Sequence, residues 1–467
     1  MIRKILVSIF IIGVYSLSMF GGEEKVAGKK LILWSQPVKT SDESVIRGRY
    51  KHYRSFLDGL IYTTGVTWKT AGENFDKLVE KDYRGVPLRK RVEIAREEGL
   101  QDNFIDILLF ARQELQWVDE EKWSAAVALL SRVASRAKDI GCVGISIDVE
   151  PYGVRNGKGR IFSTGPSNLA LKRGKEIGEA IFKEFPKAEL MLIFPASFMT
   201  RKNFLYFVRG LAESPIKNIH MGWEEYYYST TPEEIKAQDM IYTLMMILVM
   251  KNDQRLLEKC GIAPGIWPGI HENRSRLTPR EVKTEVREVF KIAKRYVWLF
   301  PPGVDWLRET DYIEAIRPSS KEKHFPYSNR YVYKIEFIPG DKSGKVPGRI
   351  EFDKENLESL LRVLFQDVTT FMYQEGRQKI PSRISGKAME IKRDFLLPEK
   401  SYLLIYLSDN TVVPLLYRGD NVFRLYTGEK PGGRAGNSSN RYTDEKYFID
   451  LELGNTRALL SKLLLAK

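Results

Sequence analysis

Apolar and polar residues follow two different patterns along this chain. Between residues 30 and 300, short apolar runs are separated by longer amphipathic stretches in a repeated strand-then-helix order. That order predicts a parallel sheet with helical crossovers. Eight strands are expected, the number found in a (β/α)₈ barrel. They are Lys30 to Trp34, Gly59 to Thr63, Phe104 to Phe110, Cys142 to Val149, Glu189 to Phe194, Ile219 to Trp223, Ile262 to Pro268 and Tyr296 to Phe300.

Three of the connecting segments carry clear helix signals. Apolar residues recur near helical spacing from Glu121 to Lys138, from Ser167 to Glu184 and from Thr278 to Lys294. Pro279 occupies a favourable first position in the last of these. The segment from Thr64 to Gln101 has few strand signals, so we expect a long loop with small helices there.

Beyond Pro318 the rhythm changes to period-two alternation with turn residues between the runs, which predicts hairpins. The runs are Tyr331 to Phe337, Ser401 to Leu407, Thr411 to Leu416 and Val422 to Tyr426. One helix is expected at Lys354 to Phe365. The predicted fold is therefore α/β, with a (β/α)₈ TIM barrel over residues 27–318 and a smaller β-sandwich-like accessory domain over 320–467.

Residues 1–22 have the form of a secretory signal peptide. Arg3 and Lys4 precede an apolar run from Ile5 to Phe20. The run is marginal for a membrane span, which takes roughly 20 apolar residues, so an uncleaved anchor is the alternative. The richest later apolar segment, Met240 to Met250, is too short to span a bilayer. We expect an exported protein, periplasmic or extracellular, with no stable membrane span after cleavage.

Charge and cysteine content narrow the classes of partner. The formal net charge is +14, and the basic residues are scattered among 60 acidic ones without a dense block. This pattern indicates a solvated surface that slightly favours an anionic carbohydrate over a neutral one and argues against nucleic acid. Cys142 and Cys260 are the only cysteines. We expect two separate core thiols rather than a disulfide.

Asp148 and Glu150 are the residues around which we expect a site. Side chains alternate between the faces of a strand, so both acids share the face that points to the barrel axis. They lie where the strand ends, and such barrels carry their active sites at the carboxyl ends of the strands. The apolar residues between them pack against the outer helices. The inward face is Ser146, Asp148 and Glu150, and the outward face is Ile145, Ile147 and Val149.

Two carboxylates at positions i and i+2 have a chemical use. Close like charges raise the pKa of one member, which then stays protonated near neutral pH and can donate to a leaving group. Glycosidic cleavage needs such an acid, with a nucleophile or a group that stabilises an oxocarbenium-like centre. The alternative is that the acids bind loop backbone or a cation. The cost of burying acids in a narrow barrel favours a functional pair.

The stretch Val143-Gly-Ile-Ser-Ile-Asp-Val-Glu150 resembles the D-x-x-D-x-D-x-E strand of family 18 glycoside hydrolases, the chitinase-like barrels. The resemblance implies that Glu150 is the general acid and that Asp148 orients a substrate acetamido group, which acts as the nucleophile. The sequence departs from that pattern at Val143 and Ser146, where the family has acids. Met221-Gly-Trp-Glu-Glu-Tyr226 resembles the M-x-Y-D-Y strand end, and Tyr296-Val-Trp298 resembles the last strand, whose Trp floors the sugar pocket. The chain also resembles uncharacterised bacterial glycosidase-like barrels with a D-x-E-P-Y segment.

Aromatic residues fall at or just after the expected carboxyl ends of the strands, where their planes could stack on the apolar faces of sugar rings. For each of them core packing is the alternative. The expected substrate-binding residues are Trp34, Tyr62, Tyr152, Trp223, Tyr226, Trp267 and Trp298, with Glu225 for hydroxyl groups.

Glu224, Glu225 and Glu272 are the candidates for a second catalytic carboxylate. A separation of roughly 5–5.5 Å from Glu150 would imply retention of configuration, and roughly 6.5–9.5 Å inversion. The four histidines are far apart, and zinc, nucleophile-elbow and phosphate-loop patterns are missing. We therefore expect no metal and no cofactor. The expected function is hydrolysis of an extracellular or periplasmic polysaccharide; the alternative is a non-catalytic carbohydrate-binding protein on a degenerate barrel.

Overall fold

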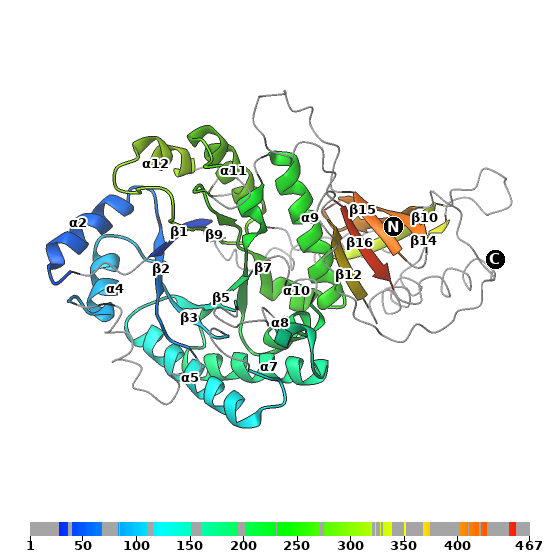
Figure 1. Cartoon of the computed structure of the whole chain (residues 1–467), viewed down its shortest axis with the longest axis horizontal. Coiled ribbons are helices and arrows are strands. Elements are labelled where there is room, and N and C mark those ends of the chain that lie inside the picture. The colour runs from blue at the N-terminus through cyan, green and yellow to red at the C-terminus, as the bar shows by residue number, and fades with distance from the viewer. Residues whose placement is uncertain are drawn as a thin grey trace, which may run out of the picture.

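The computed structural model describes most of residues 28–319 and, beyond them, mainly separate strands (Figure 1). The described residues are 28–35, 40–67, 83, 85–110, 115–150, 160–194, 198, 201–229, 231–270, 275–319, 323, 327, 330–338, 350–351, 368–373, 402–409, 411–419, 422–426 and 448–453. The expected signal peptide, the helix expected at Lys354 to Phe365, Tyr152 and Glu272 lie outside them.

Parallel strands form a closed barrel. In order around it lie β1 (Lys30–Ser35), β2 (Gly59–Thr63), β3 (Phe104–Leu108), β4 (Gly144–Asp148), β5 (Glu189–Phe194), β6 (Asn218–Trp223), β7 (Cys260–Ile262), β8 (Gly265–Ile266) and β9 (Tyr296–Leu299). β7 pairs with β6, and β8 pairs with β9.

β7 and β8 together fill a single strand position. Between them, the Ala263 amide donates to the Met221 carbonyl at 2.9 Å, and the Trp298 amide donates to the Pro264 carbonyl at 3.0 Å. The short segment thus bonds to both neighbours, and β9 pairs with β1 to complete the ring. Pro264 has no amide hydrogen, which explains why the ladder is interrupted there. The predicted (β/α)₈ barrel is confirmed.

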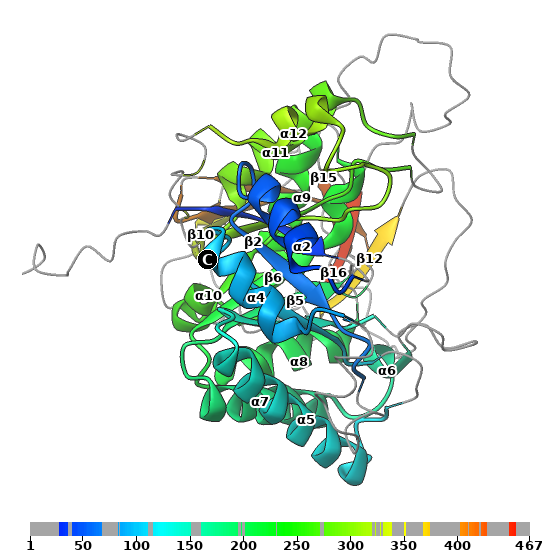
Figure 2. The same cartoon turned by 90° about the vertical axis from the view of Figure 1, so that its left-hand side faces the viewer.

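Helices surround the strands (Figure 1). They are α2 (Glu43–Tyr53), α4 (Leu88–Glu97), α5 (Glu120–Asp139), α6 (Arg160–Ser163), α7 (Ser167–Glu184), α8 (Lys202–Glu213), α9 (Pro232–Val249), α10 (Gln254–Lys259), α11 (Pro279–Ile292) and α12 (Thr310–Ile316), with a 3₁₀ helix η3 (Glu224–Tyr228). Figure 2 shows α5, α7 and α8 on one side and α11 and α12 on the opposite side. Among the described helices, none is both long and apolar enough to cross a bilayer.

The start of α11 shows how local sequence sets an element. The Thr278 hydroxyl accepts from the Glu281 amide, the Glu281 carboxylate accepts from the Thr278 amide, and Pro279 occupies the first turn. This capping box satisfies backbone donors that a helix start leaves open. The helix therefore begins where the sequence predicts.

Alternation along the strands separates two hydrophobic cores. The outer core joins the sheet to the helices and contains Ile145, Ile147 and Val149, as expected. The inner core fills the barrel with ten buried residues. They are Ile32, Trp34, Ile61, Phe104, Met191, Ile193, Tyr227, Ala263, Tyr296 and Trp298. The barrel is therefore packed rather than hollow, and a ligand can be held only at one of its ends.

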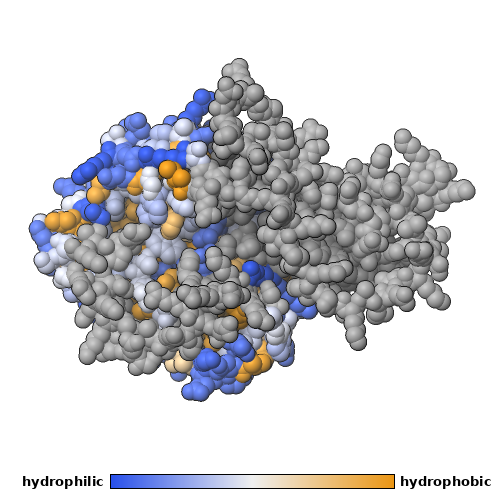
Figure 3. Space-filling view, viewed as in Figure 1, coloured by the Kyte–Doolittle hydropathy of each residue, from blue (hydrophilic) through white to orange (hydrophobic). Residues whose placement is uncertain are grey.

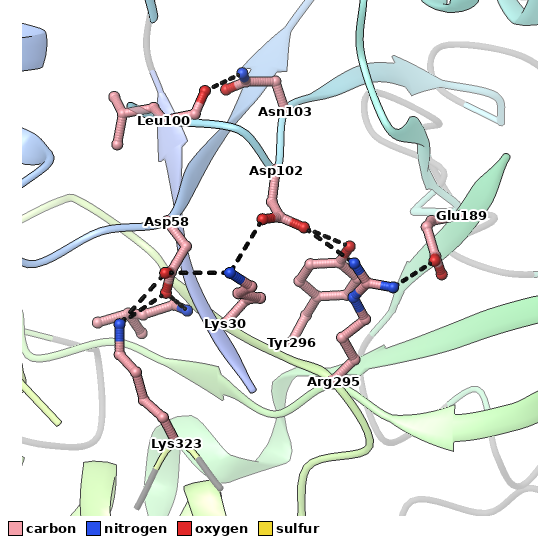
Figure 4. A network of polar contacts seen from close by, with 10 residues as sticks. Lys30, Asp58, Leu100, Asp102, Asn103, Glu189, Arg295, Tyr296 and Lys323 are labelled. Carbon is pink, nitrogen blue, oxygen red and sulfur yellow. Dashed lines mark hydrogen bonds and ion pairs between the residues drawn. The ribbon is translucent and has the colours of Figure 1, made fainter. Parts of the chain in front are cut away.

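A polar network occupies the amino-terminal end of the barrel (Figure 4). Lys30 lies 3.6 Å from Asp58 and 3.7 Å from Asp102, and Arg295 lies 2.8 Å from Glu189. The Tyr296 hydroxyl donates to Asp102 at 3.0 Å. Paired charges thus fill this end, which leaves the carboxyl-terminal end as the place for a site.

The second sheet is antiparallel, in the strand order β11-β10-β13-β14-β15-β16-β12. The β-rich character expected for this part of the chain is confirmed, and its described strands all belong to this one sheet. The strands are β10 (Val332–Ile338), β11 (Ile350–Glu351), β12 (Val368–Tyr373), β13 (Tyr402–Leu407), β14 (Val412–Gly419), β15 (Val422–Tyr426) and β16 (Phe448–Leu453).

The second sheet lies against α9 and the turn that follows it (Figure 1). The Asn252 side chain exchanges two hydrogen bonds with the backbone of Val332, at 3.0 and 3.1 Å. Arg330 contacts Asp239 on α9 at 2.5 Å and Asp409 after β13 at 2.7 Å.

On the face drawn in Figure 3, hydrophobic residues of the described part are scattered among hydrophilic ones.

Candidate active site

Asp148 and Glu150 lie at the carboxyl end of β4, as predicted. Asp148 is 1 % exposed, whereas Glu150 is half-buried. The Glu150 amide donates to Oδ1 of Asp148 at 2.8 Å, so the aspartate side chain holds the turn that carries the glutamate. The Val149 amide donates to the Ile193 carbonyl at 3.1 Å, which keeps this turn attached to β5. Asp148 is thus buried and fixed in place, whereas Glu150 is partly accessible to solvent.

A third acid, which the sequence analysis missed, lies beside this pair. Asp106 on β3 is fully buried, and the strand register places it next to Ser146. Burial raises the pKa of Asp106 well above its ordinary value, and the Asp148 carboxylate raises it further; the Ser146 hydroxyl acts in the opposite direction. The sequence signal was a lone acid inside the apolar run Phe104-Ile-Asp-Ile-Leu-Leu-Phe110, because such a charge is rarely buried without a role.

An aromatic cluster lies at the carboxyl-terminal end of the barrel. Trp34 on β1 and Trp298 on β9 have ring centroids 5.6 Å apart, and Tyr227 lies 5.5 Å from Trp298. Phe300 lies 5.2 Å from Trp267 and stacks on Tyr227 at 6.0 Å. Trp298 is completely enclosed, whereas Trp267 is half-buried. Three expected residues therefore meet here, with Trp298 as the floor and Trp267 nearer the solvent.

Tyr227 and Phe300 belong to this cluster although the sequence analysis did not select them. Phe300 has the same strand parity as Tyr296 and Trp298, which was a usable signal. Tyr227 follows the strand within η3, and a 3₁₀ helix does not keep strand parity.

Three other aromatic residues require a correction in their placement. Tyr62, Trp223 and Tyr226 are fully buried in the outer core, between the sheet and the helices, instead of at the barrel mouth. The Tyr62 hydroxyl donates to the Arg91 carbonyl at 3.5 Å, and the Trp223 ring lies 5.8 Å from that of Tyr242 on α9. Side chains alternate along β2 and β6, and Tyr62 and Trp223 fall at positions that face the helices rather than the lumen.

The candidates for a second carboxylate are only partly placed. Glu224 begins η3 directly after β6 and is half-buried. Glu225 lies in the same short helix, and its side chain is outside the described part of the structure, as are Glu272 and Tyr152. Glu224 and Glu150 follow the carboxyl ends of β6 and β4, which are parallel, so both lie at the same end of the barrel. Only β5 separates these two strands.

The two cysteines lie at the amino-terminal ends of β4 and β7, away from this end of the barrel. Cys142 and Cys260 are free and buried, which confirms the expected pair of separate thiols. Within the described ranges, no group of three or more His, Cys, Asp or Glu side chains is arranged to hold a metal ion.

Solved glycoside hydrolases are among the structures to which this chain has a low similarity. GH5_18 from Streptomyces cattleya, solved in complex with GlcNAc, has a TM-score of 0.44 at 11 % identity, over 64 % of this chain and 82 % of its own. An endo-1,4-beta-mannanase from Rhizomucor miehei has 0.43 at 11 %, over 62 % and 93 %. A GH18 chitinase from Pseudoalteromonas aurantia has 0.39 at 11 %, over 62 % and 98 %.

No family model matches the chain, and a search of curated proteins found no match. These identities and TM-scores are too low to support an argument about this chain. The barrel is instead established by the strand pairing described above, and the candidate site by the positions of its own residues.

Proposed function

We propose that this chain is a glycoside hydrolase that acts on a polysaccharide, with Glu150 as the general acid/base. The observation that carries the proposal is the position of two carboxyl groups at the carboxyl end of β4, at the barrel end that also holds the Trp34–Trp267–Trp298 cluster. Carboxyl groups beside aromatic planes suit a sugar, since the rings stack on its apolar faces and the acids act on its oxygens.

The two acids have different tasks in this proposal. Glu150 is the more exposed, so it protonates the leaving oxygen. Asp148 is fixed by its hydrogen bond from the Glu150 amide, and its negative charge stabilises the positive charge that develops at the sugar in an oxocarbenium-like transition state. The second catalytic carboxylate is one of Glu224, Glu225 and Glu272.

The substrate class follows from the surroundings as further proposals. The aromatic cluster binds sugar rings, with the half-buried Trp267 and Phe300 as its more accessible members. The excess of basic residues slightly favours an anionic glycan. The signal-like amino terminus supports an exported protein, which would meet polysaccharide outside the cytoplasm.

One observation favours a second candidate, a carbohydrate-binding protein without turnover. The strand that resembles family 18 has Val143 and Ser146 where that family has acids. Val143 packs against the inner hydrophobic core and Ser146 is buried. The aromatic cluster by itself would still bind a sugar.

The test combines turnover with binding. Release of reducing ends from chitin, mannan and an acidic polysaccharide is measured for the wild type, for Glu150→Gln and for Glu121→Gln, a matched control on the exposed face of α5. We expect Glu150→Gln to lose about 10²–10⁴-fold in rate, as for removal of a general acid, while the control keeps its activity. Equal rates in Glu150→Gln would overturn the assignment. Calorimetric binding with no turnover in any variant would favour the binding protein.

A further inference from the structure

A single row of side chains crosses three neighbouring strands just below the mouth of the barrel. Trp223 on β6 pairs in register with Phe194 on β5. The Val149 amide donates to the Ile193 carbonyl at 3.1 Å, and in a parallel ladder this bond sets Val149 opposite Phe194 as well. The row therefore runs from the end of β4 through β5 to the end of β6.

The residues that follow this row on β4 and β6 are both acids, Glu150 and Glu224. All three members of the row are buried in the outer core, between the sheet and the helices. Side chains alternate along an extended chain, so the residue after each points the other way, toward the mouth. Trp223 has extended φ and ψ angles of −82° and 122°, which carries the alternation one residue beyond β6. Glu150 and Glu224 thus enter the mouth at one level, and both are half-buried.

The segment that carries Glu224 is held on both sides. Trp223 before it is fully enclosed in the outer core, and Tyr227, three residues beyond Glu224, belongs to the inner core. The Tyr227 ring lies 5.5 Å from that of Trp298 in the aromatic cluster. A side chain that takes part in chemistry needs such a rigid support, because small displacements of it are costly in rate.

The spacing of the strands sets the distance between the two acids. β4 and β6 are separated by β5. Two strand spacings of about 4.8 Å, bent by the closure of a (β/α)₈ barrel, put the Cα atoms of Glu150 and Glu224 roughly 9 Å apart. Side chains that point to one axis converge, so the carboxyl groups lie somewhat closer than the Cα atoms. Carboxyl groups roughly 6.5–9.5 Å apart leave room for a water molecule and invert the anomeric configuration, whereas a covalent intermediate takes roughly 5–5.5 Å.

We propose that Glu224 is the second catalytic carboxylate and that hydrolysis inverts the anomeric configuration. The inference rests on the proposed function. Glu150 donates its proton to the glycosidic oxygen while the bond from that oxygen to the anomeric carbon breaks. Glu224 takes a proton from a water molecule, whose oxygen bonds to the anomeric carbon on the opposite face. The products are two shorter chains with one new reducing end, and the proton gained by Glu224 returns to Glu150 through solvent.

The configuration of the product tests the proposal without any variant. The probe is a chitin oligosaccharide, soluble mannan or an acidic polysaccharide, whichever the wild type hydrolyses, and proton NMR follows the new reducing end before mutarotation. We expect the first product to have the configuration opposite to that of the cleaved bond, which is the α anomer from the β-linked chains of chitin and mannan. A first product with the configuration of the cleaved bond would overturn the proposal.

The role of Glu224 needs a readout that loss of packing does not produce. Glu224→Gln should lose about 10²–10⁴-fold in rate, as for removal of a general base, while Glu121→Gln on the exposed face of α5 keeps the wild-type rate. In Glu224→Ala, added azide should restore turnover and form a glycosyl azide of inverted configuration, because the small anion attacks where the activated water did. An undiminished rate in Glu224→Gln, or a lost rate that azide does not restore, would mean that Glu224 is not the base.

The two proposals fail in different measurements. Absence of turnover by the wild type on all of these glycans removes the glycosidase proposal and this inference with it. Turnover with retained configuration, or turnover at the full rate in Glu224→Gln, removes only the role of Glu224 and leaves Glu150 as the acid/base.

Discussion

Replacement of Arg330 by Met should weaken the barrel itself, although Arg330 lies beyond it. Nη1 of Arg330 contacts Asp239 on α9 at 2.5 Å and the Thr243 hydroxyl at 3.2 Å, and its Nε contacts Asp409 at 2.7 Å. The side chain of Asp239 is only 8 % exposed. Met keeps much of the side-chain length but leaves this buried carboxylate without its cation.

The size of the effect follows from the two ion pairs. Removal of one partner of a buried pair costs about 3–5 kcal/mol, and the lower end applies because Arg330 is 20 % exposed. The more exposed contact with Asp409 adds less than about 1 kcal/mol. We therefore expect Arg330→Met to lower the free energy of unfolding by about 3–4 kcal/mol at pH 7.

The loss should depend on pH in a defined direction. Burial raises the pKa of Asp239 above its ordinary value, and Arg330 opposes that rise. The folded protein thus holds this proton more tightly than the unfolded chain, whose aspartates titrate near about 3.9, so stability from Asp239 is full below that pH and is lost as pH rises through the folded pKa. Without Arg330 the pKa rises further. The cost of Arg330→Met is therefore larger at pH 7 than at pH 4.

Urea unfolding followed by tryptophan fluorescence measures this cost in the barrel, since all eight tryptophans lie between residues 34 and 306. The matched control is Arg330→Met in an Asp239→Asn background, where most of the cost should vanish because no buried charge is left unpaired. A cost below about 1 kcal/mol at pH 7, or an equal cost at both pH values, would refute the reasoning.

Two further predictions concern packing. Gly265→Ala should cost about 1–3 kcal/mol and change the near-ultraviolet circular dichroism, because the new Cβ would lie 2.6 Å from Cζ2 of Trp298 and 2.8 Å from Cε1 of Tyr227; an unaltered spectrum would contradict the described aromatic cluster. Cys142 and Cys260 should react with a thiol reagent only after unfolding, since burial raises the pKa of both thiols, that of Cys260 to about 12; rapid labelling of the native protein would show that they are accessible.

The barrel could be predicted from sequence because its strands are short apolar runs set between amphipathic helices. β2, β5 and α7 begin and end at the residues that the sequence pattern predicts. The interruption at Pro264 could not be located, since it depends on which neighbour each half of the strand pairs with.

The site was predictable only in part, for two physical reasons. Side chains alternate along a strand, so a residue at a strand end faces either the lumen or the helices. This alternation places Tyr62 and Trp223 on the helix side, although both lie near the rim of the barrel. Asp106 is different: its place in an apolar run marks it in the sequence, but its nearness to Ser146 and Asp148 appears only from the register of β3 and β4. Such cross-strand neighbours are far apart in the sequence.

The most direct test of the central claim is a crystal structure of Glu150→Gln with an oligosaccharide that the wild type hydrolyses. We expect the scissile oxygen within hydrogen-bonding distance of the substituted side chain, with a sugar ring against Trp267 and the anomeric carbon facing Asp148. An oligosaccharide bound away from the carboxyl end of β4, or with its scissile oxygen beyond the reach of the side chain at position 150, would contradict it.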